Sequence, residues 1–319
     1  MPDALFSTYL LPAVLAFIMF GMGLSLTTQD FRLIGLHPKG VFLGLISQLG
    51  LLPLFALLVA YGAGLVGLPP EFQVGLVLVA ACPGGAVSNL ISYLLKANVA
   101  LSVAITSLNS LLVVFTAPSI IRGALWLFMP QTDKALSLPF WETVGQIVLI
   151  TVFPCVLGLY IRAWRANWAL AIEPRLRVLM PLMLAGAMLG AIFLEKSGGP
   201  SLQMSSYAEL SFFVLVLNVG GMYLGYYLAK IAHLKRNDCL TIGIEVGLQN
   251  TGLAITIATS RLFLDNPTMA IPASIYALFT FATAIGFGLA VKPSLWNKMK
   301  FNTLISRSIT KPKPSSKNS

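Results

Sequence analysis

Long apolar stretches alternate with short polar connectors along most of the chain. A transmembrane helix needs about 20 mostly apolar residues to cross the hydrocarbon layer. Nine stretches predict such helices, at residues 5–26, 39–62, 72–95, 100–127, 141–162, 178–194, 207–232, 239–263 and 270–291. The pattern therefore predicts an all-α polytopic membrane protein. Its transporter-like membrane domain would span residues 1–291, and the polar, Pro- and Ser-rich residues 292–319 would form a flexible basic cytoplasmic tail.

Composition agrees with this pattern. The chain is 57% hydrophobic and only 10% charged, with a mean hydropathy of +0.83, more apolar than a water-soluble domain. Its net charge of +10 is scattered between apolar segments, so we expect no nucleic-acid partner. Neither the three cysteines nor the two histidines show the spacing of a disulfide framework or a metal site, and we expect no cofactor.

The basic residues also predict the orientation, because cytoplasmic loops carry an excess of Lys and Arg. With the N-terminus outside, 17 of the 21 basic residues fall on the cytoplasmic side. The outside then holds only Arg122, Lys134, Lys196 and Arg261. We therefore expect a multi-pass protein of the cell membrane with a cytoplasmic C-terminus.

Two of the nine stretches are interrupted at their centres, one at residues 81–89 and the other at 245–252. Each is the third in a run of four, so helices one to four and six to nine form matching halves around a single fifth helix. Because one helix links the two four-helix halves, the halves enter the membrane from opposite sides. This 4+1+4 inverted repeat, with broken helices crossing near the midplane, is typical of secondary transporters.

The interruptions free backbone groups that hydrocarbon cannot satisfy, because Pro lacks a donor and Gly tolerates unwound conformations. Sodium suits the carbonyl, hydroxyl, amide and carboxylate oxygens that flank both breaks. The alternative interpretation is that Pro and Gly only kink or closely pack these helices.

Glu245 gives the sharpest signal. An acidic residue at the centre of a membrane helix costs about 2.5–3.5 kcal/mol on insertion scales, which implies a partner. No basic residue lies at that depth in another predicted helix. A bound cation or a proton is therefore the expected countercharge, and a protonated, purely structural Glu245 is the alternative.

Three segments resemble the signature segments of the bile acid:sodium symporter family. They are Cys82-Pro-Gly-Gly-Ala-Val-Ser-Asn89, Asn98-Val-Ala-Leu-Ser-Val-Ala-Ile-Thr106 and Glu245-Val-Gly-Leu-Gln-Asn-Thr-Gly252. Phe20-Gly-Met-Gly-Leu24 and Gln48 also match, and the resemblance runs in order from the first helix to the ninth.

The resemblance implies a panel and a core subdomain with two sodium sites behind the crossing. One sodium ion would be held by Ser88, Asn89, Ser102, Thr106 and Glu245. The other would be held by Gln48, Glu245, Gln249 and the carbonyl groups of Val246 and Leu248.

Departures from the family bear on the substrate and on the helix count. Bacterial relatives of known structure have ten helices, whereas animal carriers resemble this chain in having nine. Many members have Thr where Ala86 stands, and some have a His-Asn pair where Thr280 and Phe281 align. The half-helix start at Gly85 and Ala86, together with Asn250, suits a carboxylate.

We therefore expect a monomeric sodium-coupled symporter that imports an organic anion, of bile-acid type or a small monocarboxylate, by alternating access. The partners would be the anion, sodium ions and the bilayer. Proton coupling through Glu245 is the alternative. An intramembrane enzyme is not expected, because Ser88 has no His or Lys at its depth to act as a base. A channel or receptor would predict neither two opposed breaks nor a shared carboxylate.

Overall fold

Every regular element in the part of the chain that the computed structural model describes is a helix. That part comprises residues 10–25, 27, 35–130, 140–172, 175–176, 179, 183, 204–260 and 263–293, so all but two residues of the helix predicted at 178–194 lie outside it. The elements are α2 (Leu11–Ser25), α4 (Pro38–Ile46), η2 (Ser47–Leu51), α5 (Leu52–Leu65), α6 (Pro70–Ala80), α7 (Ala86–Leu94), α8 (Val99–Phe128), α10 (Phe140–Ile147), η3 (Val148–Val152), α11 (Phe153–Trp164), α13 (Met204–Ile231), α14 (Arg236–Gly247), α15 (Thr251–Thr259), η4 (Pro267–Ala270) and α16 (Ile271–Val291).

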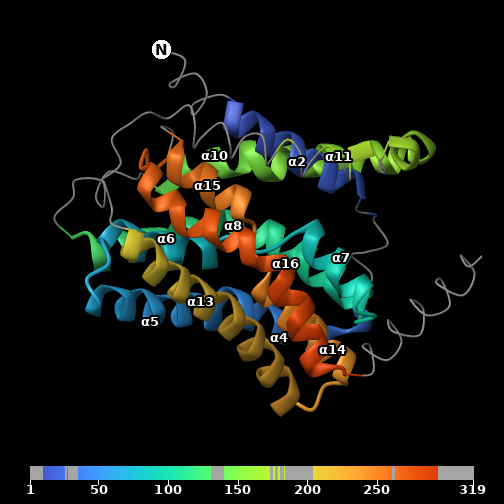
Figure 1. Cartoon of the computed structure of the whole chain (residues 1–319). Helices are drawn as coiled ribbons and strands as arrows, with labels where there is room; N and C mark the ends of the chain where they lie inside the picture. The colour runs from blue at the N-terminus through green and yellow to red at the C-terminus, as the bar shows by residue number, and fades with distance from the viewer. Residues whose placement is uncertain are drawn as a thin grey trace, which may run out of the picture.

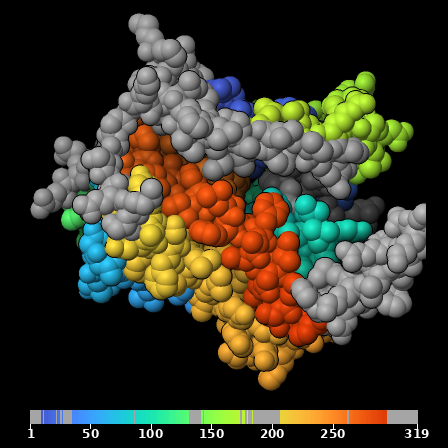
Figure 2. Space-filling view, in the orientation of Figure 1, coloured from blue at the N-terminus to red at the C-terminus, as the bar shows by residue number. Residues whose placement is uncertain are grey.

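The exterior of the helices is apolar over long stretches. Five helical runs are long and apolar enough to cross a membrane: Pro38–Leu65, Val99–Phe128, Val144–Trp164, Ser206–Ile231 and Pro267–Val291. On α5, the side chains at 54, 58, 61 and 65 form one exposed apolar stripe at helical spacing. Figure 2 shows α13 and α16 together on one face. Leu278 of α16 is 79% exposed. Such faces fit lipid and not water, and the chain is a multi-pass membrane protein.

The helices α2, α10, η3 and α11 form a layer beside the other helices, here called the α2–α11 layer (Figure 1). Two glycines let the backbones of α2 and α11 meet. A side-chain carbon at Gly23 would overlap the carbonyl oxygen of Cys155, and one at Gly158 would overlap that of Phe20. Small residues commonly allow such close contact between membrane helices.

Two long helices each contain one wide π turn, η2 and η3, and each turn lies just before a proline. A proline ring clashes with the carbonyl group four residues earlier. For Pro53 that residue is Leu49 and for Pro154 it is Ile150, and both lie inside the wide turns. The i→i+5 pattern removes the clash and lets the helix continue. As a result, Gln48 projects from a wide turn.

The two predicted breaks are confirmed. One helix stops at Ala80 and resumes at Ala86, and the other stops at Gly247 and resumes at Thr251. Both breaks are shorter than predicted: the first covers only residues 81–85 of the expected 81–89, and the second is shorter than the expected 245–252. Glu245 is itself helical, in the last turn of α14, so only residues 248–250 are unwound.

Candidate functional site

The two unwound segments touch each other directly. Pro83 and Gln249 form an isolated antiparallel bridge, and the Asn250 N–H donates to the Cys82 carbonyl group over 2.9 Å. Gly84 permits this contact, because a side-chain carbon there would overlap the carbonyl oxygen of Leu248. The breaks therefore satisfy part of each other's backbone hydrogen-bonding capacity, as buried polar groups require.

Two side chains donate hydrogen bonds to the last residue of α14. The carbonyl oxygen of Gly247 accepts from Nδ2 of Asn218 at 2.8 Å and from the Tyr276 hydroxyl at 2.6 Å. These side chains come from α13 and α16, and both are fully buried. Neither residue was predicted from the sequence. The available signal was a lone amide in the apolar stretch 207–232, since polar residues at membrane depth are costly and usually functional.

Glu245 is 1% exposed and lies against two hydroxyls of α8. The Ser102 hydroxyl donates to one carboxylate oxygen, and the Thr106 hydroxyl donates to the other at 3.0 Å. Ser102 and Thr106 are four residues apart and share one helix face. In the part of the chain that the structure describes, Glu245 has these hydroxyl partners and no ion pair with a basic side chain.

Helix register explains why these groups meet. One turn before Ser102 and Glu245, the Asn98 backbone N–H donates to Oγ1 of Thr241 at 2.8 Å. The Asn98 side chain also donates to Asp238 at 2.7 Å. Advancing four residues along both helices leads from Asn98 and Thr241 to Ser102 and Glu245. The α8 and α14 helices therefore run in parallel with matched turns.

The start of α7 completes this cluster. The Asn89 side-chain oxygen lies 3.4 Å from the Thr106 hydroxyl, a longer contact that competes with the 3.0 Å bond to Glu245 for the single Thr106 proton. The buried Ser88 hydroxyl donates to the Gly85 carbonyl at 2.7 Å and also interacts with Glu245. Because a serine hydroxyl has one proton, Ser88 cannot donate to Glu245 while it donates to Gly85. The structure thus brings Ser88, Asn89, Ser102, Thr106 and Glu245 together from α7, α8 and α14.

A second cluster joins the wide turn η2 to the break after α14. Nε2 of Gln48 donates to Oε1 of Gln249 at 2.9 Å, and a weaker reciprocal contact measures 3.3 Å. Nε2 of Gln249 also donates to the Val246 carbonyl at 2.7 Å. The Leu248 carbonyl lies against Gly84. The Glu245 carboxylate makes its hydrogen bonds within the first cluster. The next residue, Val246, belongs to the second cluster through its carbonyl group, so the last turn of α14 connects the two clusters.

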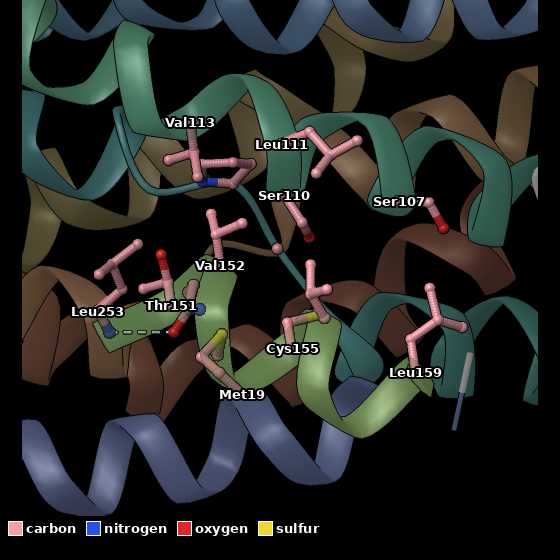
Figure 3. A pocket seen from close by; sticks show the side chains of 14 residues that line it. Met19, Ser107, Ser110, Leu111, Val113, Thr151, Val152, Cys155, Leu159 and Leu253 are labelled. Carbon is pink, nitrogen blue, oxygen red and sulfur yellow. Dashed lines mark hydrogen bonds between the residues drawn. The ribbon is translucent and has the colours of Figure 1, made fainter. Parts of the chain in front are cut away.

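A partly open cavity lies between the α2–α11 layer, α8 and the crossing of the breaks. Figure 3 shows Ser107 and Ser110 on α8, opposite Thr151 and Cys155 of η3 and α11. The floor at the crossing includes Pro83, Gly84 and Asn250. Of the three residues predicted to bind the substrate, Asn250 lines this cavity. Gly85 and Ala86 are not among the lining residues and lie at the start of α7.

Thr280 and Phe281 do not line this cavity. The buried Thr280 hydroxyl donates to the Tyr276 carbonyl at 2.8 Å. Phe281 is half exposed on the outer apolar face of α16, together with Leu278 and Ile285. Neither side chain is among the cavity lining, so the departure at these positions changes the packing and outer face of α16.

Comparison with known proteins gives consistent matches. A family model described as the sodium bile acid symporter family matches residues 12–199. An uncharacterised sodium-dependent transporter of Bacillus subtilis, YocS, is 33% identical over 267 residues, which cover 83% of this chain and 77% of that protein. The ileal sodium/bile acid cotransporter of Oryctolagus cuniculus is 28% identical, over 87% of this chain and 77% of its own length. A probable chloroplastic sodium/metabolite cotransporter of Arabidopsis thaliana, BASS1, is 30% identical over 82% of this chain, which spans 61% of the plant protein.

Proposed function

The chain belongs to the sodium bile acid symporter family, and we propose that it imports an organic anion with sodium ions by alternating access. The anion would be of bile-acid type or a small monocarboxylate. Membership makes the chain a sodium-dependent cotransporter and not an enzyme. The observation that carries the proposal is the buried Glu245 carboxylate, held by two hydroxyls directly behind the crossed breaks.

The coupling sodium ions would bind at the two clusters. The first site uses Ser88, Asn89, Ser102, Thr106 and Glu245. The second uses Gln48, Glu245, Gln249 and the carbonyl oxygens of Val246 and Leu248. Support comes from the chemistry of these groups, because hard cations prefer oxygen ligands and the clusters offer hydroxyl, amide, carbonyl and carboxylate oxygens.

Membership of the family favours sodium over a proton as the ion that neutralises Glu245. Both carboxylate oxygens accept hydrogen bonds from hydroxyls. Each oxygen keeps a second lone pair, which can accept a proton or coordinate a sodium ion. Proton coupling through Glu245 therefore remains the second candidate and is tested separately below.

The anion would bind on the cavity side of the crossing. The helices α7 and α15 both begin there, and their first N–H groups lack partners within the helix. A helix N-terminus attracts negative charge by about 0.3–1 kcal/mol when exposed. The Asn250 amide, the Gly85 backbone and the start of α7 at Ala86 would receive the carboxylate.

The topology that we propose is nine membrane helices in a 4+1+4 inverted repeat, with panel and core subdomains over residues 1–291. Two features support it: the matched positions of the breaks and the separate α2–α11 layer. The basic residues support an outside N-terminus in the cell membrane, with residues 292–319 as a cytoplasmic tail. We propose that the transporter works as a monomer.

The driving force would be ample with two sodium ions and one monoanion per cycle. One net charge crossing about 100 mV contributes roughly 2.3 kcal/mol. A tenfold gradient for each ion adds roughly 2.8 kcal/mol. The total of about 5 kcal/mol supports accumulation of several thousandfold.

A gradient-jump assay in proteoliposomes tests this function. A sodium jump at constant pH and a pH jump at constant sodium are applied separately, with a panel of labelled organic acids. We expect uptake of at least one acid after the sodium jump and none after the pH jump alone. Uptake driven only by the pH jump would establish the proton-coupled alternative, and uptake of no acid under either jump would contradict both.

A further inference from the structure

Three hydroxyl groups that line the cavity have already committed their protons to the backbone. Ser107 donates to the Val103 carbonyl at 2.8 Å, and Ser110 donates to the Thr106 carbonyl at 2.8 Å. Across the cavity, Thr151 donates to the Ile147 carbonyl at 2.5 Å. Each bond returns to the residue four positions earlier, a common arrangement for hydroxyls in membrane helices.

Because of these return bonds, the three hydroxyl groups present only hydrogen-bond acceptors to the cavity. A hydroxyl group has one proton and two lone pairs, so a hydroxyl that donates to its own helix can only accept from a ligand. Ser107, Ser110 and Thr151 therefore present lone pairs. They come from both sides of the cavity, from α8 and from η3 (Figure 3).

Asn250 has the opposite character. Its Oδ1 accepts from the Leu253 N–H at 3.0 Å, a bond that caps α15. With its oxygen occupied, the side chain presents its two amide protons as donors. Among the described lining residues no side chain is charged, so this donor and the helix starts at the crossing distinguish one end of the cavity from the other.

This polarity fixes the pose of an anion. A carboxylate is purely an acceptor, so it pairs with Asn250 and is repelled by the lone pairs of the three hydroxyls. The body of the same molecule lies against those lone pairs. A body without donors leaves buried acceptors unpaired, and sites built to pair with a substrate O–H or N–H discriminate strongly against analogues that lack it.

We propose that this cavity selects organic acids whose body carries hydroxyl or N–H donors, with the carboxylate at Asn250 and the donors on Ser107, Ser110 and Thr151. This selection rests on the proposed function, because it concerns the substrate of the same transporter. It narrows the substrate from organic anions in general to hydroxylated or amide-bearing acids.

The test compares acids that differ only in their hydroxyl groups. Thermal stabilisation of the purified full-length chain in sodium is measured with 3-hydroxybutyrate against butyrate, and with cholate against 5β-cholanoate. We expect the hydroxylated member of at least one pair to bind at least tenfold more tightly. Ser110→Ala and Thr151→Val should each reduce that ratio severalfold. Ser119→Ala is the matched control, because Ser119 makes the same return bond on α8 but is exposed outside the cavity.

Sodium-driven uptake of the same acids then separates this inference from the proposed function. Equal binding within both pairs, binding of neither pair, or a preference that survives both variants would overturn the inference. Sodium-driven uptake without hydroxyl preference would leave the proposed function in place. Hydroxyl-selective binding without sodium-driven uptake would instead support the inference and contradict the proposed coupling.

Discussion

The backbone of Gly84 lies directly against the carbonyl oxygen of Leu248, where the two broken helices cross. Gly84→Ala would place a methyl group on that oxygen and push the unwound segments apart. We expect sodium-driven uptake to fall at least tenfold, because both proposed ion sites depend on this crossing. Uptake per molecule of inserted protein measures the effect.

Gly123→Ala is the control for this substitution. Gly123 lies on α8 with open space around the position of a side chain. Alanine is the better helix former there by about 1 kcal/mol. Uptake by Gly123→Ala should match that of the parent, and a Gly84→Ala variant with the same uptake would mean that the crossing tolerates separation.

Glu245→Gln keeps the volume of the side chain and removes its charge. We expect sodium-driven uptake to collapse and sodium to lose its stabilising effect on the purified protein, while insertion in the membrane persists. The reason is that Glu245 is the one charged ligand in both proposed sites. Glu142→Gln, on the exposed first turn of α10, should leave uptake unchanged. Normal sodium dependence in Glu245→Gln would remove the basis for both sites.

The two clusters should contribute separately to sodium affinity. Ser102→Ala and Thr106→Val each leave one carboxylate oxygen without its hydroxyl donor, at about 1–3 kcal/mol per buried unsatisfied group. Gln48→Ala and Gln249→Ala disrupt the paired amides. All four should raise the sodium concentration for half-maximal uptake.

The Hill coefficient for sodium distinguishes one ion from two. We expect a value near two in the parent and a fall toward one when either cluster is altered. Thr116→Val, whose hydroxyl only returns to the Leu112 carbonyl on the exposed side of α8, should change neither quantity. A parent coefficient of one at saturating substrate would count against two coupled ions.

Asn218 and Tyr276 should act as alternative supports for the Gly247 carbonyl. Tyr276→Phe or Asn218→Leu leaves one donor in place, so each should cost about 0.5–1.5 kcal/mol of stability. The double variant leaves the carbonyl unpaired and should lose more than the sum of the two. Thermal unfolding measures this coupling. Tyr61→Phe on the exposed face of α5 controls for loss of a phenol, and strict additivity would refute joint support.

Asn250→Asp separates the two roles of that side chain. An Asp oxygen can still cap α15, but the amide donor is replaced by a negative charge. Uptake of the acid should be lost, while sodium binding in the absence of substrate should persist.

In the parent, an acid should also compete far better than its methyl ester. Equal competition by acid and ester would show that the cavity recognises shape alone.

Sequence was sufficient to locate the breaks, because Pro83, the glycines beside it and a buried acid are costly in hydrocarbon. It also placed Ser102 and Thr106 on one face, since that needs only helical spacing. The family resemblance supplied the other side chains of both clusters, which spacing alone could not. Membrane helices are apolar on every side, so periodicity does not tell which helix faces which. The donors Asn218 and Tyr276 were missed for this reason.

The roles of the cavity hydroxyls were also hidden in the sequence. Ser107, Ser110 and Thr151 look like possible donors, and only the return bonds to their own helices show that their protons are used. The wide turns are a similar case. Pro53 and Pro154 indicate a disturbance of the helix, but a kink and a π turn are both consistent with a proline.

The bond between the Asn250 N–H and the Cys82 carbonyl group also has a consequence for biogenesis. Ribosomes add about 5–20 residues per second, so the partner of Cys82 is synthesised roughly ten to thirty seconds after it. During that interval the first break enters the bilayer without the segment that completes it. Water or the insertion machinery must hold its polar groups until α15 emerges. The crossing is therefore a late event in folding, and a nascent chain truncated before residue 250 should leave the first break accessible to thiol reagents at Cys82.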